Sequence, residues 1–141
     1  DTPDSSVAAC AAGVPAIGYG EDASHYGADC ALVSSVWNWG PIYVDKVQQV
    51  MDGTWKAGEY WGGFDKNNIV LSDFNTSVPD AVRQKVLAEQ KKLEAGQDDI
   101  FAGPLYDQKG ALMIPEGQKA SDKDLLTMRW LVKGVKGSIP Q

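Results

Sequence analysis

The stretch from residue 31 to residue 41 constrains the fold of this chain more than any other. Leu32, Val33 and Val36 favour a strand, and no breaker stands among them. Pro41 favours the first turn of a helix, because its ring fixes φ and its missing N–H is not needed there. The sequence therefore predicts a strand that runs directly into a helix. In open α/β sheets, ligands bind on such turns, at the carboxyl ends of strands.

Two indoles and a carboxamide occupy the predicted turn. Trp37 and Trp39 each offer a flat, polarisable face and one N–H donor. Asn38 adds two donors and an acceptor, which suffice to bind the edge of a heterocycle. We therefore expect a stacking site for a flat, largely neutral ligand. The alternative is that both indoles are core or interface packing, because buried aromatic side chains are common.

The first part of the chain alternates helices and buried strands. Hydrophobic spacing predicts, in order, a helix over residues 2–13, a strand over 14–19, a polar loop over 20–27, the central strand, and a helix from residue 41 to residue 53. This alternation is typical of a parallel sheet with helices on its faces. The predicted fold class is α/β, a three-layer lobe with a mainly parallel sheet.

The second part is more varied. Residues 53–64 are rich in glycine and aromatic side chains, and part of this segment is expected to form an extended strand near a sheet edge. A strand over 69–74, a helix ending at Gly96 and a hairpin of strands 100–106 and 111–114 follow. A final helix is predicted from residue 121, opened by a capping box.

The charge balance argues against a nucleic-acid partner. The 141-residue chain carries a formal net charge of −6, which repels phosphate unless a local basic patch intervenes. Lys85, Lys91 and Lys92 form no such patch, because Glu89 and Glu94 alternate with them. The length suits one domain with a real core, and no apolar run approaches the ~20 residues of a membrane span.

The polar loop between the first two predicted strands is a candidate for ligand contact. Glu21, Asp22 and His25 are close in sequence, but neither a nucleophile nor a metal accompanies them, so we expect no catalysis. The loop follows a strand beside the central one, which places Gly20, Glu21 and Asp22 where ligands bind in such sheets. No metal or cofactor is expected, since the chain has a single histidine and no close pair of cysteines.

Cys10 and Cys30 leave two interpretations open. They form a disulfide if the protein is exported, or they are two small buried hydrophobic residues. The N-terminus opens straight into a predicted helix with no signal peptide before it, which we interpret as an internal cut.

Several segments together resemble one family. They are residues 15–19 (PAIGY), 36–43 (VWNWGPIY), 53–63 (GTWKAGEYWGG), 101–105 (FAGPL) and 135–140 (VKGSIP). In these strings, and over nearly its whole length, the chain resembles the C-terminal part of the basic-membrane-protein family of substrate-binding proteins for ABC importers.

The resemblance implies a periplasmic-binding-protein-like fold and a role in transport. Family members are exported or lipid-anchored, so it implies a periplasmic or extracellular membrane-anchored protein. They have two α/β lobes joined by hinge crossovers, trap ligand between the lobes and deliver it to a permease. Characterised relatives bind purine nucleosides. Residues 1–141 would correspond to the second lobe plus the closing tail, with the N-terminal lobe missing.

Two positions depart from the family's nucleoside binders. These usually carry an aspartate where this chain has Gly20 and a lysine near the position of Trp37. In the family those two charged groups hold the ribose hydroxyls. Here the hydroxyls would lose their partners while a base gains an indole to stack on, and each effect amounts to about 1–3 kcal/mol. Both favour a bare purine base over a nucleoside.

The sequence therefore predicts a solute-binding component of an ABC importer, not an enzyme, which captures a purine base or nucleoside in an interlobe cleft. The expected contacts come from Trp37, Asn38, Trp39, Gly20, Glu21 and Asp22. Two alternatives remain: a carbohydrate-binding protein with an aromatic platform, and the ligand-sensing domain of a regulator.

Overall fold

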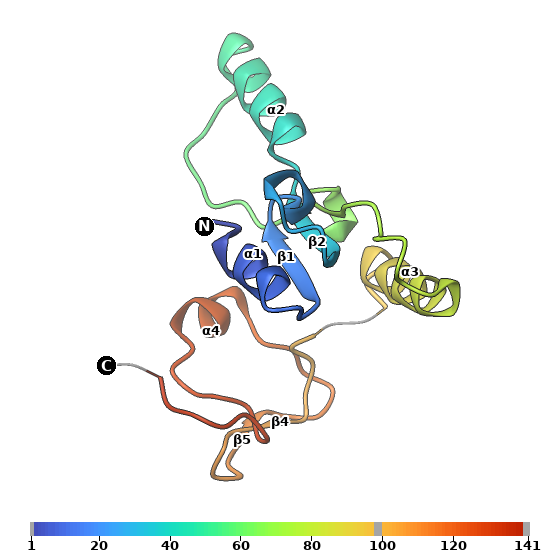
Figure 1. The fold of residues 1–141 in the computed structure, drawn as a ribbon. Helices are drawn as coiled ribbons and strands as arrows, with labels where there is room; N and C mark the ends of the chain where they lie inside the picture. The colour runs from blue at the N-terminus through green and yellow to red at the C-terminus, as the bar shows by residue number, and fades with distance from the viewer. Residues whose placement is uncertain (1, 98–99, 140–141) are drawn as a thin grey trace. The chain divides into compact units, whose positions relative to one another are not determined.

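The computed structural model describes residues 2–97 and 100–139 (Figure 1). The chain forms two compact units, Asp1–Ala95 and Gly96–Gln141. The first unit contains, in order, α1 (Asp4–Ala11), β1 (Ala16–Gly20), the 3₁₀ helix η1 (Ala23–Tyr26), β2 (Ala31–Trp37), α2 (Trp39–Met51), the 3₁₀ helix η2 (Phe64–Lys66), β3 (Ile69–Leu71) and α3 (Asp80–Glu94). The second contains β4 (Leu105–Tyr106), β5 (Leu112–Ile114) and α4 (Asp122–Thr127).

The sheet of the first unit has the strand order β1-β2-β3, so β2 is its central strand. β1 pairs with β2 in parallel, and β3 pairs with β2 antiparallel. The predicted α/β class is therefore confirmed, with a sheet that contains one parallel and one antiparallel pairing. That residues 1–141 belong to one lobe of a two-lobed protein stays a prediction.

Small side chains bring β1 and β2 close together. Gly18 lies against Ser34, which is fully buried, and a Cβ atom on Gly18 would sit 2.1 Å from the Ser34 Oγ. The Ser34 hydroxyl accepts the N–H of Ala23 at 3.1 Å, and the Ser34 N–H donates to the Ser72 hydroxyl at 2.9 Å. A single buried serine thus connects the centre of the sheet to η1 and to the segment after β3.

The core of the first unit is small and lies beside α1. Ala23, Ala28 and Ala31 form its buried centre, and Val7 and Cys10 of α1 pack against it. Cys10 and Cys30 form a disulfide with a Cα–Cα distance of 5.3 Å, which settles the choice that the sequence left open. The bridge therefore fixes α1 to the residue that precedes β2.

The predicted strand within residues 53–64 is wrong: residues 54–63 form no regular structure. Glycine is costly to order in a strand, and this segment has glycines at 53, 58, 62 and 63. Side-chain contacts anchor it instead of a ladder of backbone bonds. The Tyr60 hydroxyl donates to Asn68 Oδ1 at 2.7 Å, and Lys66 Nζ donates to the carbonyl of Trp61 at 2.7 Å.

In the second unit the predicted hairpin forms, but its first strand is confined to Leu105–Tyr106 instead of residues 100–106. β4 and β5 are antiparallel, and Asp107 Oδ1 closes the turn by accepting the N–H groups of Lys109 and Ala111, both at 2.8 Å. The capping box of α4 is also confirmed, with Ser121 and Asp124 bonded in both directions. The hydrogen bond from the Ser121 hydroxyl lowers the pKa of the Asp124 carboxyl.

Removing the disulfide should destabilise the first unit. The bridge closes a loop with a sequence separation of 20, so the variant Cys10→Ala/Cys30→Ala should lose about 3 kcal/mol of unfolding free energy through the larger entropy of its unfolded chain. Urea unfolding followed by tryptophan fluorescence measures the loss. Dithiothreitol should lower the wild-type midpoint to that of the variant and leave the variant unchanged. Equal midpoints for oxidised and reduced wild type would contradict the expectation.

Candidate functional site

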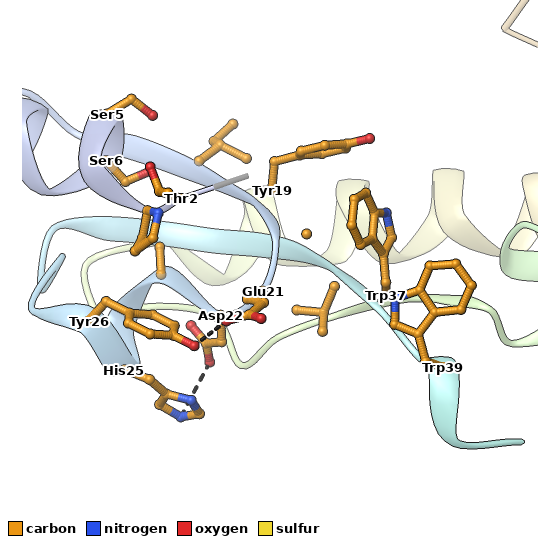
Figure 2. A pocket seen from close by; sticks show the side chains of 15 residues that line it. Thr2, Ser5, Ser6, Tyr19, Glu21, Asp22, His25, Tyr26, Trp37 and Trp39 are labelled. Carbon is orange, nitrogen blue, oxygen red and sulfur yellow. Dashed lines mark hydrogen bonds and ion pairs between the residues drawn. The ribbon is translucent and has the colours of Figure 1, made fainter. Parts of the chain in front are cut away.

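A cavity of about 640 Å³ opens at the carboxyl ends of β1 and β2, within the first unit (Figure 2). Its size falls in the range of small-molecule sites, about 300–1,000 Å³. Its walls come from the start of α1, the end of β1, η1 and the turn after β2. The lining residues are Thr2, Pro3, Ser5, Ser6, Ile17, Tyr19, Gly20, Glu21, Asp22, Ala23, His25, Tyr26, Val36, Trp37 and Trp39.

Sheet register brings the aromatic rings of the cavity together. Tyr19 is paired with Ser35 in the parallel ladder, so Trp37, two residues further along β2, projects from the same face. The rings of Tyr19 and Trp37 meet edge to face, with centroids 5.4 Å apart. Trp37 and Trp39 meet in the same way at 5.9 Å, and Trp39 stacks on Tyr43 at 5.9 Å.

The indole of Trp37 is not sealed in the interior. Trp37 is half-buried and lines the cavity, while Tyr19 and Trp39 are 68% and 48% exposed. The edge-to-face contacts hold the Trp37 ring without covering it by a parallel ring. Part of the Trp37 side chain is therefore exposed at the cavity.

Gly20 lies directly beside Trp37. A Cβ atom built on Gly20 would sit 3.7 Å from Cζ3 of the indole, an ordinary van der Waals contact. Gly20 has a φ of +86°, which side chains rarely adopt, so glycine suits this position conformationally. Gly20 and Trp37, the two positions singled out from the sequence resemblance, are therefore neighbours in space.

The opposite wall is acidic and rests on η1. Asp22 caps η1: its Oδ1 accepts the Ser24 N–H at 3.1 Å and the Ser24 hydroxyl at 2.8 Å. Its Oδ2 lies 3.8 Å from Nε2 of His25. The Tyr26 hydroxyl donates to Oε2 of Glu21, and this bond together with the Glu21 charge raises the pKa of Tyr26. Figure 2 shows Tyr26 and His25 on one side of the cavity and the two indoles on the other.

Five of the six predicted contact residues line this cavity: Trp37, Trp39, Gly20, Glu21 and Asp22. Asn38 does not line it. Its backbone N–H donates to the Asn68 carbonyl at 2.8 Å and its side-chain Nδ2 to the Asn67 carbonyl at 3.0 Å. Asn38 thus fixes the turn that carries the two indoles, through the left-handed turn at Asn67.

Sequence reasoning missed the contributions of α1 and of Tyr26. Thr2, Ser5 and Ser6 reach the cavity only because the disulfide and the alanine core hold α1 beside β1, and no local pattern predicts that. The turn of η1 brings the Tyr26 hydroxyl back within hydrogen-bonding distance of Glu21. Asp22, the N-cap of η1, was the sequence signal that could have predicted this turn.

Between residues 2 and 97 and between 100 and 139, no group of three or more His, Cys, Asp or Glu side chains is placed to hold a metal ion. In the same ranges, no helix combines the length and apolar character that a membrane crossing requires.

A cavity at the ends of parallel strands, walled by aromatic rings and hydrogen-bond acceptors, is typical of proteins that capture small molecules. Residues 7–97 match the family model described as PnrA-like ABC-transporter substrate-binding protein (Bmp), and the chain belongs to this family. The resemblance stated from the sequence is thereby confirmed. By its description, this is a family of substrate-binding proteins.

Two curated relatives cover most of this chain. A purine-binding protein of Brucella abortus is 33% identical over 129 residues, which are 92% of this chain and 37% of the relative. A protein of Haloferax volcanii, named as an ABC-transporter glucose-binding protein, is 28% identical over 141 residues, which are 99% of this chain and 33% of the relative. The chain thus spans about a third of the length of these relatives.

A solved structure supports the fold. The transcriptional activator of the comK gene from Bacillus halodurans superposes with a TM-score of 0.61 at 23% identity, over 70% of this chain and 35% of that one. At this identity the likeness concerns the fold alone.

The positive φ of Gly20 leads to a prediction. Gly20→Ala should lower the free energy of unfolding by about 1–2 kcal/mol, because the φ of +86° is strained for any residue with a Cβ atom. Gly58→Ala is the matched control: Gly58 is exposed in the segment 54–63, without a positive φ and with nothing within 4 Å of an added Cβ, and its substitution should change the free energy of unfolding by no more than about 0.5 kcal/mol. The urea midpoints of the two variants and the wild type measure these changes. A Gly20→Ala midpoint equal to that of the wild type would show that the backbone at this position is not strained.

Proposed function

We propose that this chain belongs to the solute-binding component of an ABC importer and that its cavity receives a purine base. The indole of Trp37, half-buried at the carboxyl end of β2 and lining the cavity, is the observation that carries the proposal. Stacking of a base on an aromatic ring contributes about 1–3 kcal/mol and accepts any planar base. The name of the Brucella abortus relative, a purine-binding protein, agrees with this ligand class.

The neighbourhood of Gly20 favours a bare base over a nucleoside. Gly20 has no side chain with which to bind a ribose hydroxyl. The Trp37 side chain offers only a ring face and one N–H donor. Buried hydroxyls without partners cost about 1–3 kcal/mol each. Adenine or hypoxanthine therefore suits the cavity better than adenosine or inosine.

The remaining cavity residues have distinct roles in this proposal. Trp39 supports the Trp37 ring and extends the aromatic wall, and Glu21 and Asp22 accept hydrogen bonds from the edge of the base. Asn38 is a positioning residue, because its side-chain Nδ2 and its backbone N–H donate the hydrogen bonds that hold the turn. No residue is assigned a catalytic role, since capture and release require none.

The remaining steps of transport are inferred from membership of the family. We propose that residues 1–141 form the second lobe and closing tail of a two-lobed protein, that ligand is enclosed between this lobe and an N-terminal one, and that the loaded protein docks on a permease. A periplasmic or membrane-anchored extracellular location fits the Cys10–Cys30 disulfide, because such bonds persist in oxidising compartments.

A sugar is the second candidate ligand. It is favoured by the glucose-binding name of the Haloferax volcanii relative and by the aromatic wall, on which a pyranose ring can also lie. Sugars need several hydrogen-bonding side chains of both kinds, whereas Glu21, Asp22 and the Tyr26 oxygen on the acidic wall supply acceptors.

Titration calorimetry decides between the ligand classes. The 141-residue chain, and in parallel the full product of the gene that contains it, should bind adenine about tenfold or more tightly than adenosine, since each unpartnered hydroxyl costs more than 1 kcal/mol. Glucose should give no heat. Tighter binding of adenosine than of adenine would reject the assignment of a bare base as ligand. Binding of glucose without binding of a purine would show that the ligand is a sugar.

Replacing the stacking ring should weaken binding strongly. Trp37→Ala removes about 1–3 kcal/mol of stacking, so the adenine dissociation constant should rise roughly 5- to 150-fold. Trp55→Ala is the control, because Trp55 is half-exposed and does not line the cavity. Equal losses in both variants, or none in Trp37→Ala, would show that the indole does not hold the base.

A further inference from the structure

The acidic wall of the cavity is arranged around one hydrogen bond that the stacking argument does not use. Glu21 follows β1 directly, and Tyr26 is the last residue of η1. The Tyr26 hydroxyl donates to Oε2 of Glu21, and both residues line the cavity (Figure 2). This bond connects the end of η1 to the end of β1 and holds the Glu21 carboxylate at the cavity wall.

The acidic wall presents mainly hydrogen-bond acceptors to a ligand. The phenol has one proton, which it donates in the hydrogen bond to Glu21, so its oxygen presents only lone pairs to a ligand. The ionised Glu21 carboxylate has no proton, and its Oε1 remains available as an acceptor. Asp22 has its Oδ1 engaged by the backbone N–H and hydroxyl of Ser24, and its Oδ2 faces His25. The glutamate and the phenol therefore form an acceptor-only edge.

The phenol keeps its proton throughout the physiological range. The hydrogen bond to Glu21 and the negative charge of that residue both raise the pKa of Tyr26. A protonated Tyr26 is required for the bond, and the bond is lost when the pH rises above the pKa of the phenol.

We propose that the Tyr26–Glu21 pair makes the cavity select heterocycles with an exocyclic amino group over those with an oxo group at the same position. An amino group donates to Oε1 of Glu21, whereas an oxo group turns its lone pairs toward a carboxylate. The proposal rests on the purine-binding function and names the purine class within it: aminopurines such as adenine before oxopurines such as hypoxanthine.

The exposure of the pair limits the size of the selection. A fully enclosed polar contact rejects the wrong partner by factors of about 10⁴ or more, because the partner is left without any bond. Glu21 and Tyr26 are exposed at the cavity rim, so water replaces part of a missing bond. We expect a preference for adenine over hypoxanthine of about tenfold, which is near 1.4 kcal/mol.

The decisive variant exchanges one acceptor for a donor. In Glu21→Gln the Tyr26 hydroxyl can still donate to the amide oxygen, and the amide N–H₂ then faces the ligand where Oε1 stood. The ratio of the hypoxanthine to the adenine dissociation constant, about ten in the wild type, should fall to one or below when calorimetry is done on the full product of the gene that contains this chain. Tyr26→Phe releases the Glu21 carboxylate from its position and should narrow the ratio to within about twofold, with hypoxanthine affinity largely kept.

Glu59→Gln is the matched control, because it removes the same charge from an exposed glutamate that does not line the cavity, and it should leave the ratio at its wild-type value. Equal affinity of the wild-type chain for the two purines, or an unchanged ratio in Glu21→Gln, overturns the selection while the purine site stands. Binding of neither purine overturns the proposed function and the selection together.

Discussion

The close approach of Gly18 to Ser34 is the contact on which the rest of the first unit depends. The two strands can pair in parallel there only because β1 has no side chain at that point. The buried serine then uses both its hydroxyl and its N–H, one toward η1 and one toward the segment after β3. The ends of β1 and β2, and with them the walls of the cavity, are positioned by this one residue pair.

From that pairing the cavity acquires two chemically different walls. The end of β2 and the start of α2 supply rings, and the loop after β1 supplies carboxylates and a phenol. Gly20 stands where the walls meet: it faces the Trp37 ring and precedes Glu21 in the chain. A planar base placed against the ring would therefore bring its edge toward the acceptors, so one orientation satisfies stacking and hydrogen bonding together.

The strand-to-helix turn was predictable because its signals are local. Strand-forming side chains before Trp37 and the proline at 41 define β2 and α2 without reference to the rest of the chain. The hairpin of β4 and β5 and the capping box of α4 were predictable for the same reason. Membership of the family followed from ordered strings of residues.

Features that depend on distant contacts were not predictable. Residues 54–63 carry aromatic side chains typical of strands, yet no neighbouring strand pairs with them, and β propensity reflects such neighbours. The amide of Asn38 looked suited to a ligand, but its Nδ2 donates a hydrogen bond to the carbonyl of Asn67, 29 residues away in sequence. The disulfide likewise depends on how α1 packs, which the spacing of two cysteines leaves undetermined.

The edge-to-face contact between Trp37 and Trp39 has a spectroscopic consequence. Two indoles with centroids 5.9 Å apart and planes inclined by 72° have transition dipoles that are close and not parallel, so their excited states mix. Mixed states of this kind produce paired bands of opposite sign in circular dichroism. The turn at the mouth of the cavity therefore carries its own optical signature, which any molecule that shifts either ring would alter without a label.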